Sequence, residues 1–245
     1  MSDDPIPAAT VIVVRDRPEG CELLMVERAG GMAFAAGAMV FPGGRIDDAD
    51  RELARETGVE AGLVAAVREA IEETAVPVGL APVPSPDLAR ELQDALIADQ
   101  PLAGLLVAYG LEIDASAIVT FARWVPQFHA VRRFDTLFFV ARSPDGEWRP
   151  RVIEAECAAA EWVRADEVLE RERNGQAQLI FPTRRTLERL ALRSSFEEIR
   201  ADASAFPVEP ITPWVEERGG EKFITIPANL GFPVTEERLD GLWRG

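Results

Sequence analysis

The chain has 245 residues, of which 47% are hydrophobic, so it is long and apolar enough to bury a core as one large domain or two small ones. A formal net charge of -16 argues against binding of nucleic acid, which needs a basic face for the phosphates. No apolar run is long enough for a membrane span or a secretory signal, and Cys21 and Cys157 form no disulfide framework. We therefore expect a cytoplasmic protein with neither a membrane nor a nucleic acid partner.

The first elements predicted from the sequence are strands. Residues 10–15 and 21–28 are apolar or β-branched runs separated by Asp16, Pro18 and Gly20, a pattern that predicts a hairpin. A short strand at 38–41 is then expected to lead into Pro42, Gly43 and Gly44, where glycine lets the backbone approach a ligand closely.

The next segment, 45–59, is polar and acidic. We expect its aspartates in a loop that precedes a short helix: Asp47, Asp48 and Asp50. An Asp at this place is either a helix N-cap in a solvated loop or a functional carboxylate.

A helix over 62–76 is the central prediction. At 3.6 residues per turn its apolar residues share one face, Leu63, Val67, Ala70, Ile71 and Thr74, and its carboxylates share the other, Glu69, Glu72 and Glu73. Like charges at these spacings repel, so something must compensate. Mg²⁺ or Mn²⁺ prefers such oxygen ligands, and Arg68 is placed to orient a carboxylate. The alternative is a solvated acidic helix face.

Beyond the central helix, four prolines in 76–86 indicate a connector, and 87–111 shows helical spacing broken near Pro101. The region 84–113 is thus a predicted helical insertion, either a lid over the substrate or a cover for a sheet edge. Strands are expected at 117–125 and 134–141. The intervening loop carries His129, the sole histidine, which is either a general base or a surface residue.

The last third of the chain is predicted to contain a strand or loop over 151–161, a helix over 165–174 and a helix over 182–200, with Thr183 near its N-cap. From residue 205 the pattern changes to short strands and prolines. We expect this C-terminal extension, 205–245, to fold onto the same domain or onto a second copy in a homodimer. No linker divides the chain, so 1–245 is predicted to be a single domain.

These motifs resemble the signature of the Nudix hydrolases, G-x5-E-x7-R-E-U-x-E-E-x-G-U, where U is a bulky aliphatic residue. Gly44, Arg68-Glu69, Glu72-Glu73 and Val76 match it. Asp50 stands in place of the first Glu, the segment from Asp50 to Arg68 is longer than the pattern has it, and Ala70 is small for an aliphatic position. Ala75 replaces a glycine at a helix end that often needs positive φ, at a cost of up to about 1 kcal/mol.

Three further segments resemble the subgroup that contains coenzyme A diphosphatases, which has an elongated Nudix loop and a helical insertion. They are the run from Arg28 to Gly44, residues 132–139, and Glu156 before Trp162. The resemblance implies an α/β fold, namely a Nudix-type α/β/α sandwich with a mixed sheet.

The resemblance also implies a metal-dependent pyrophosphohydrolase acting on a nucleoside diphosphate linked to another moiety. The Gly44 carbonyl with Glu69, Glu72 and Glu73 would hold the ions, and Glu69 or Glu156, with Glu154 behind it, would accept the proton of water. Coenzyme A or acyl-CoA is the implied substrate, while ADP-ribose, dinucleotides and nucleotide sugars stay open.

Three arginines are candidates for substrate binding, and one alternative function is open. Arg28, Arg132 and Arg133 are candidates for substrate binding, and the last two are equally a basic pair that flanks a strand. Glu154 and Glu156 are equally surface residues. A protein of another class, a catalytically silent Nudix-fold sensor or scaffold, would be expected to lose a box glutamate or gain a basic face, and this chain does neither.

Overall fold

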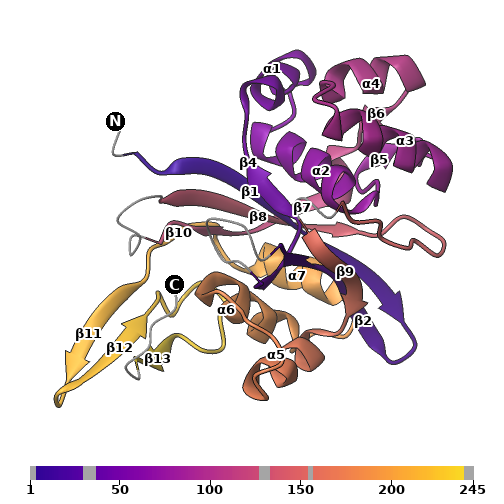
Figure 1. Ribbon diagram of the computed structural model, residues 1–245. Coiled ribbons are helices and arrows are strands. Elements are labelled where there is room, and N and C mark those ends of the chain that lie inside the picture. The colour runs from indigo at the N-terminus through magenta and orange to yellow at the C-terminus, as the bar shows by residue number, and fades with distance from the viewer. Residues whose placement is uncertain (1–3, 30–36, 127–132, 154–156, 240–245) are drawn as a thin grey trace.

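A mixed sheet separates two layers of helices in the computed structural model, which describes residues 4–29, 37–126, 133–153 and 157–239 (Figure 1). Within these ranges the sheet has eight strands: β1 Ile6–Arg17, β2 Gly20–Arg28, β3 Met39–Val40, β4 Gly43–Arg45, β7 Ile118–Trp124, β8 Phe134–Arg142, β9 Cys157–Val163 and β10 Pro210–Ile211. The predicted α/β/α sandwich with a mixed sheet is confirmed.

The order of the sheet is β10-β7-β8-β1-β2-β3, with β4 paired to β1 and β9 paired to β2. The β1–β8 and β10–β7 pairs are parallel and the others are antiparallel. The predicted hairpin is β1 and β2, which pair antiparallel. Pairing of β4 with β1 brings Gly43 opposite Thr10 and Gly44 opposite Ala9, at the center of the fold.

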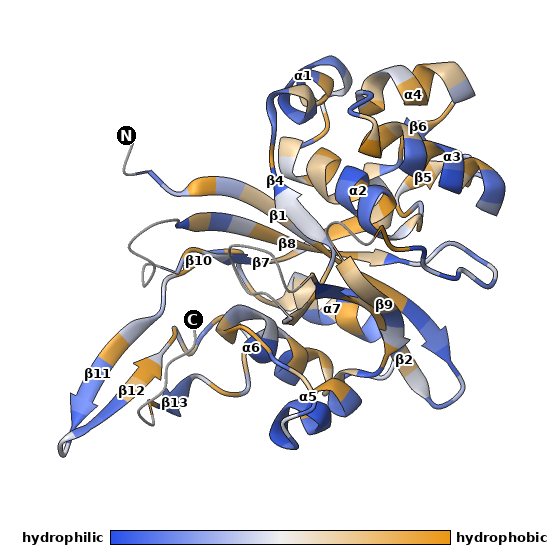
Figure 2. Ribbon diagram, viewed as in Figure 1, coloured by the Kyte–Doolittle hydropathy of each residue, from blue (hydrophilic) through white to orange (hydrophobic). Residues whose placement is uncertain are grey.

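Strand β1 shows why both faces of the sheet are covered. Val11 and Val13 belong to one buried cluster, while Ile12 and Val14 belong to the other. Successive side chains of a strand point to opposite faces, so an unbroken apolar run requires a helical layer on each side. Figure 2 shows these apolar strands between the two layers.

One layer contains the predicted central helix and the insertion. Its helices are α1 Asp48–Thr57, α2 Ala61–Thr74, α3 Pro86–Ile97 and α4 Leu102–Tyr109, and the short strands β5 Leu80–Ala81 and β6 Glu112–Ile113 pair at the base of the insertion, before the 3₁₀ turn η1 Ala115–Ala117. The helix break predicted near Pro101 is confirmed. Helix α3 packs against α2, and α4 packs against α1, so the insertion covers α2 rather than a sheet edge (Figure 1).

The other layer consists of α5 Ala165–Arg173, α6 Phe181–Leu190 and α7 Phe196–Ala205. The single helix predicted over 182–200 is therefore wrong, because the chain ends one helix and starts another. Ser195 is the N-cap of α7, and its side chain accepts a hydrogen bond from the Glu198 amide, which favors a new helix start. Thr183 is buried inside α6, and Ile180 holds the N-cap position instead.

Part of the C-terminal extension packs against the main sheet and the α5 to α7 layer. Strand β10 extends the main sheet by pairing with β7, and Ile226, Leu230 and Phe232 are buried in the core beside α5 to α7. A separate antiparallel sheet follows, made of β11 Trp214–Arg218, β12 Glu221–Thr225 and β13 Glu236–Arg238. In Figure 1 it lies to one side of the α5 to α7 layer.

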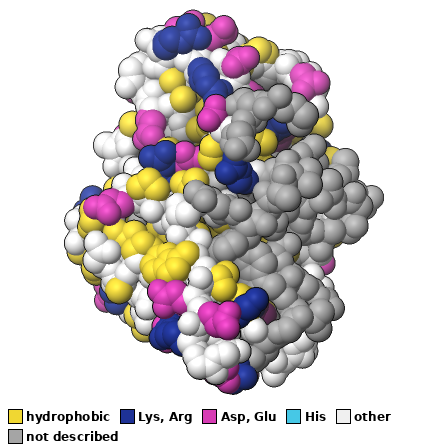
Figure 3. All heavy atoms as spheres, turned by 90° about the vertical axis from the view of Figure 1, so that its left-hand side faces the viewer, with side chains coloured by type: hydrophobic (Ala, Val, Ile, Leu, Met, Phe, Trp, Pro, Cys, Tyr) yellow, Lys and Arg dark blue, Asp and Glu magenta, His cyan; other side chains and the backbone are white. Residues whose placement is uncertain are grey.

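The surface carries single charges around a few apolar groups. Figure 3 views the molecule from the left of Figure 1, where hydrophobic side chains gather in the lower half and basic side chains lie singly among acidic ones. Exposed hydrophobic residues of the extension include Trp214 and Val215 on β11. In the part of the chain that the structure describes, no helix combines the length and apolar character that a membrane crossing needs.

Candidate active site

Helix α2 presents its apolar face to the core and its carboxylates to β4. The five residues predicted to face inward are all buried: Leu63, Val67, Ala70, Ile71 and Thr74. On the other side Glu69 and Glu73 are each only 9% exposed, and Glu72 is half-buried. The acidic face is therefore not a solvated one. Burial of carboxylates is costly unless they are paired, so their partners define the site.

Arg68 is the principal partner. Its Nη1 lies 2.9 Å from Glu69 Oε1 and 3.0 Å from Glu72 Oε2, so one nitrogen joins two of the three box carboxylates. Its Nη2 also donates to the Arg45 carbonyl at 3.0 Å. This arginine supplies the compensation that three crowded glutamates require.

Asp50 holds the opposite side of the same guanidinium. Its two carboxylate oxygens each lie 3.0 Å from Arg68, Oδ1 from Nε and Oδ2 from Nη2. Asp47 is the N-cap of α1 and forms a capping box with Asp50. The expectation that Asp48 and Asp50 lie in a loop is wrong, because both belong to the first turn of α1. Capping bonds and the acidic preference of a helix N-terminus account for this start.

The pKa of Arg68 is raised despite its burial. Burial by itself lowers this pKa, but the hydrogen bonds that Arg68 donates to Asp50 and the charges of Glu69, Asp50 and Asp47 outweigh it. Arg68 is consequently a permanent cation that stabilizes the ionized forms of its neighbors.

The pKa of Glu69 is raised to about 7, chiefly because burial disfavors its charged form. Arg68 opposes this shift through its charge and its hydrogen bond, while Glu72 and Asp50 add to it through repulsion. A carboxyl that titrates near neutrality is suited to exchanging protons with water.

The two glycines of β4 contact the glutamates of α2. The Gly43 amide donates to Glu73 Oε2 at 3.1 Å. A Cβ at Gly44 would lie 2.1 Å from Glu69 Oε1, so the carboxylate occupies the space that any side chain would need. Neither glycine has a positive φ. Glycine is required here for close approach.

The chemistry of these groups fits a hard divalent ion. All donors are oxygens, from Glu69, Glu72, Glu73 and the Gly44 carbonyl, and such ions prefer oxygen ligands. Within the described ranges, however, no group of three or more His, Cys, Asp or Glu residues is arranged to hold a metal as it stands. Arg68 occupies Glu69 Oε1 and Glu72 Oε2, so an ion would have to displace it or use other oxygens.

Two of the arginines predicted to bind substrate lie at the ends of strands. Arg28 is the last residue of β2, and its Nε is buried with no hydrogen-bond partner in the described part of the chain. Arg133 immediately precedes β8, and its carbonyl accepts from the Ile6 amide at 2.7 Å. The remaining predicted residues lie outside the described residues: Glu154, Glu156, Arg132 and His129.

One residue of this region was missed. Gln93 of α3 is fully buried, and its Nε2 donates to the Glu72 carbonyl at 3.0 Å. The available signal was its position: it falls four residues after Ala89 and three before Leu96, on the apolar face of an amphipathic helix. A lone polar residue on such a face needs a buried partner.

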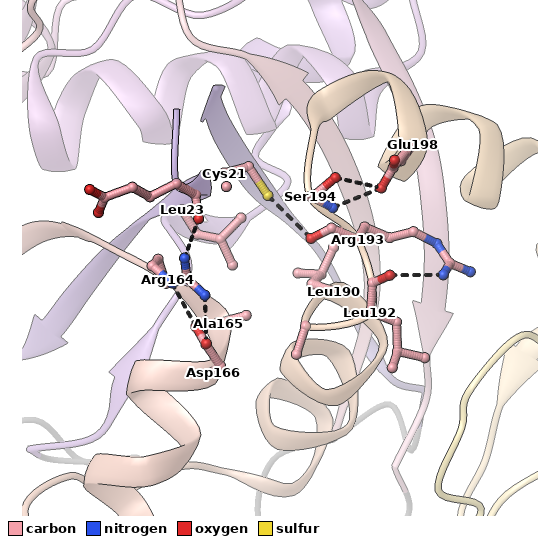
Figure 4. Close-up of a pocket in the computed structure, with 13 residues that line it drawn as sticks. Cys21, Leu23, Arg164, Ala165, Asp166, Leu190, Leu192, Arg193, Ser194 and Glu198 are labelled. Carbon is pink, nitrogen blue, oxygen red and sulfur yellow. Dashed lines mark hydrogen bonds and ion pairs between the residues drawn. The ribbon is translucent and has the colours of Figure 1, made fainter. Parts of the chain in front are cut away.

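A pocket on the other face of the sheet is separate from this site. It has a volume of about 250 Å³ and lies between the β1–β2 turn, the start of α5 and the α6–α7 connection (Figure 4). Its polar groups bond one another: Cys21 Sγ lies 3.7 Å from the Arg193 carbonyl, and Arg164 pairs with Asp166 at 2.7 Å. Burial raises the pKa of the Cys21 thiol, so it stays protonated.

Comparisons with solved structures agree with the fold. The crystal structure of a NUDIX hydrolase from Alicyclobacillus acidocaldarius is similar to this chain with a TM-score of 0.70 and 29% identity, over 84% of this chain and 99% of that one. The NUDIX domain of Shewanella oneidensis NrtR, complexed with ADP ribose, is similar at a TM-score of 0.47 and 16% identity, over 76% of this chain and 86% of that one. The similarity to the Alicyclobacillus acidocaldarius structure shows that the chain has the Nudix fold.

The sequence comparison covers a shorter stretch. Over 70 residues, 29% of this chain, the sequence is 41% identical to an uncharacterized Nudix hydrolase, NudL, of Cronobacter sakazakii (strain ATCC BAA-894). The match spans 31% of the length of that relative. No family model matches the chain. The local identity and the shared fold together support the Nudix hydrolase family.

Proposed function

We propose that this protein is a metal-dependent pyrophosphohydrolase that cleaves a nucleoside diphosphate linked to another moiety. The observation that carries the proposal is the Arg68 junction, in which one nitrogen lies within 3.0 Å of both Glu69 and Glu72 while Glu73 is held on Gly43. A structural acidic face would have no need for buried carboxylates gathered beside two glycines.

The site residues then have distinct roles. Glu69, Glu72, Glu73 and the Gly44 carbonyl would hold Mg²⁺ or Mn²⁺. When bound, such an ion neutralizes phosphate oxygens and acidifies water. Arg68 orients Glu69 and Glu72 through its hydrogen bonds. The groups for phosphate are Arg132, Arg133 and Arg28, whose Nε is buried with no hydrogen-bond partner among the described residues.

The reaction adds water to one phosphorus of the P-O-P bridge. The bond from that phosphorus to the bridging oxygen breaks, and the bridging oxygen leaves with the other phosphate. The proton of water passes to a carboxylate, either Glu69, whose pKa of about 7 suits the task, or Glu156.

The substrate we favor is coenzyme A or acyl-CoA, on the resemblance of three segments to coenzyme A diphosphatases. ADP-ribose, dinucleotides and nucleotide sugars are the alternatives, since the same P-O-P chemistry serves them all. A cytoplasmic location and a homodimer are further parts of this proposal, and light scattering after gel filtration tests the dimer.

The test is a substrate panel with Mg²⁺ or Mn²⁺ that contains coenzyme A, acetyl-CoA, ADP-ribose, a dinucleotide and a nucleotide sugar. We expect one of these classes to be hydrolyzed, chelator to abolish turnover, and Glu73→Gln to lower kcat by about 100-fold or more. Absence of turnover on every substrate, with no binding of divalent ion, would contradict the proposal. Tight nucleotide binding without turnover would indicate the alternative, a sensor or scaffold.

A further inference from the structure

At the C-terminal end of helix α2, two backbone carbonyls accept hydrogen bonds from residues outside the helix. The last four carbonyls of an α-helix have no partner within the helix. The Ile71 carbonyl is bonded by the Ala75 amide at 2.8 Å, but the Glu72 carbonyl accepts from the side chain of Gln93 and the Thr74 carbonyl from the Arg151 amide at 2.8 Å. The insertion and a distant segment thus complete the end of α2.

Gln93 also connects the end of α2 to the distant segment at residue 151. Its Nε2 donates to the Glu72 carbonyl at 3.0 Å and to the Arg151 carbonyl at 2.8 Å. The next residue, Asp94, forms an ion pair with Arg151 at 2.7 Å. Gln93 and Asp94, which are adjacent in α3, therefore hold Arg151 beside the end of α2.

The orientation of the Gln93 amide follows from its partners. Only the NH₂ group can donate, and both of its hydrogens are used on carbonyls, so a flipped amide would place oxygen against oxygen. The Oε1 atom is buried and has no hydrogen-bond partner among the described residues. A buried acceptor without a hydrogen bond lowers stability. Local features that lower stability in this way are expected at functional sites.

The bonded carbonyl lies in the peptide that joins Glu72 to Glu73. The side chain of Glu72 reaches Arg68 at 3.0 Å, and that of Glu73 reaches the Gly43 amide at 3.1 Å. Helix ends fray, and fraying of this turn would move both carboxylates away from their partners.

We propose that Gln93 is a positioning residue of the active site, which holds the last turn of α2 so that Glu72 and Glu73 stay beside Arg68 and β4. The inference rests on the proposed function for its catalytic consequence, and on the described hydrogen bonds alone for its structural consequence. In this way α3 of the helical insertion stabilizes the position of the site carboxylates without contacting them through the Gln93 side chain.

The experiment replaces Gln93 by Met, which keeps the length of the side chain but removes both donors. Gln100→Met is the matched control, because it makes the same change at an exposed residue just after α3. We expect kcat to fall by about 10-fold and the Mn²⁺ concentration for half-maximal binding to rise by a similar factor, with KM for the nucleotide unchanged. The control should match the wild type in all three.

Amide hydrogen exchange provides a readout that does not depend on turnover. We expect Gln93→Met to speed exchange of the Gly43 amide by about 10-fold, although that amide donates to Glu73 and the Gln93 side chain donates to the Glu72 and Arg151 carbonyls. A purely structural role for Gln93 would leave kcat, Mn²⁺ binding and this amide unchanged in folded protein, and that result would overturn the inference.

Failure of the proposed function is distinguishable from failure of this inference. If the wild type hydrolyzes nothing and binds no Mn²⁺, the proposed function fails, and exchange at Gly43 alone decides the role of Gln93. If Gln93→Met does not fold, Gln93→Asn is used with the same readouts, because it keeps the amide and shortens its reach by one methylene.

Discussion

Asp50 and Arg68 form a two-pronged ion pair across eighteen residues of sequence, with Nε–Oδ1 and Nη2–Oδ2 distances of 3.0 Å each. Asp50 is 2% exposed, and it belongs to the first turn of α1, whereas Arg68 belongs to α2. The pair therefore connects the start of α1 to the glutamates of α2.

Removing this carboxylate tests the connection. We expect Asp50→Asn to lower the free energy of unfolding by about 3 kcal/mol, because the variant leaves Arg68 with only the more distant Asp47, whose Oδ2 lies 3.9 Å from Nε, as a charged partner on that side. Activity should fall by about 10-fold to 100-fold, since Arg68 would no longer hold Glu69 and Glu72 in place. Urea unfolding and steady-state kinetics measure the two effects. Asp48→Asn, at an exposed residue of the same turn, should leave both within error.

The glycine beside Glu69 has a similarly specific consequence. We expect Gly44→Ala to reduce kcat by about 100-fold, because the new methyl would displace the Glu69 carboxylate from its place beside β4. Gly104→Ala is the control: its Cβ meets nothing within 4 Å, so it should be active and slightly more stable. Wild-type activity in Gly44→Ala would show that Glu69 can shift without loss.

Ala75, which replaces a glycine of the Nudix pattern, ends α2 with a φ of 57°. Left-handed backbone strains an L-residue, so we expect Ala75→Gly to raise the free energy of unfolding by about 0.5–1 kcal/mol. Chemical denaturation measures it. Ala191 ends α6 with right-handed backbone, so Ala191→Gly should instead lower stability. Equal effects at both positions would contradict the strain.

Glu69 should make the stability of the metal-free protein depend on pH. Its pKa is raised from the ordinary value of 4.5 to about 7 in the folded protein, so the folded state binds the proton more tightly. The resulting stabilization is complete below the ordinary pKa and is lost as pH rises through about 7. We expect the unfolding midpoint of the wild type to fall relative to Glu69→Gln between about pH 5 and pH 8, with chelator present. Parallel profiles for the two proteins would contradict the raised pKa.

A buried ion pair joins α6 to α7, and its arginine also bonds the C-terminal extension. Arg189 Nε lies 2.6 Å from Asp202 Oδ2, and Arg189 Nη1 donates to the Leu230 carbonyl at 3.1 Å. We expect Asp202→Asn to lower the free energy of unfolding by about 3–5 kcal/mol, because Arg189 would stay buried without its partner. Calorimetry should show one transition for the wild type if 1–245 is a single domain. Asp166→Asn, at an exposed pair, should change little.

The sequence alone determined the features that depend on local periodicity. Alternation and turn residues predicted the β1–β2 hairpin, helical spacing predicted α2 and its buried face, and a pattern position predicted left-handed backbone at Ala75. The hairpin and the helix follow from chain geometry within a few residues, where propensity and pattern act directly, whereas the backbone at Ala75 was inferred from the resemblance to the Nudix signature. The break between α6 and α7 was missed because the apolar spacing continues across it, and a single serine cap divides the two helices.

Only the tertiary structure decided which distant groups meet. The sequence shows Asp50 as an acidic residue in a long loop, and packing of α1 on α2 brings it to Arg68. It shows Gln93 as one glutamine in an insertion, and packing of α3 on α2 brings it to the Glu72 carbonyl. These contacts arise because buried polar groups must find partners wherever the fold provides them, and no local spacing encodes which partner that is.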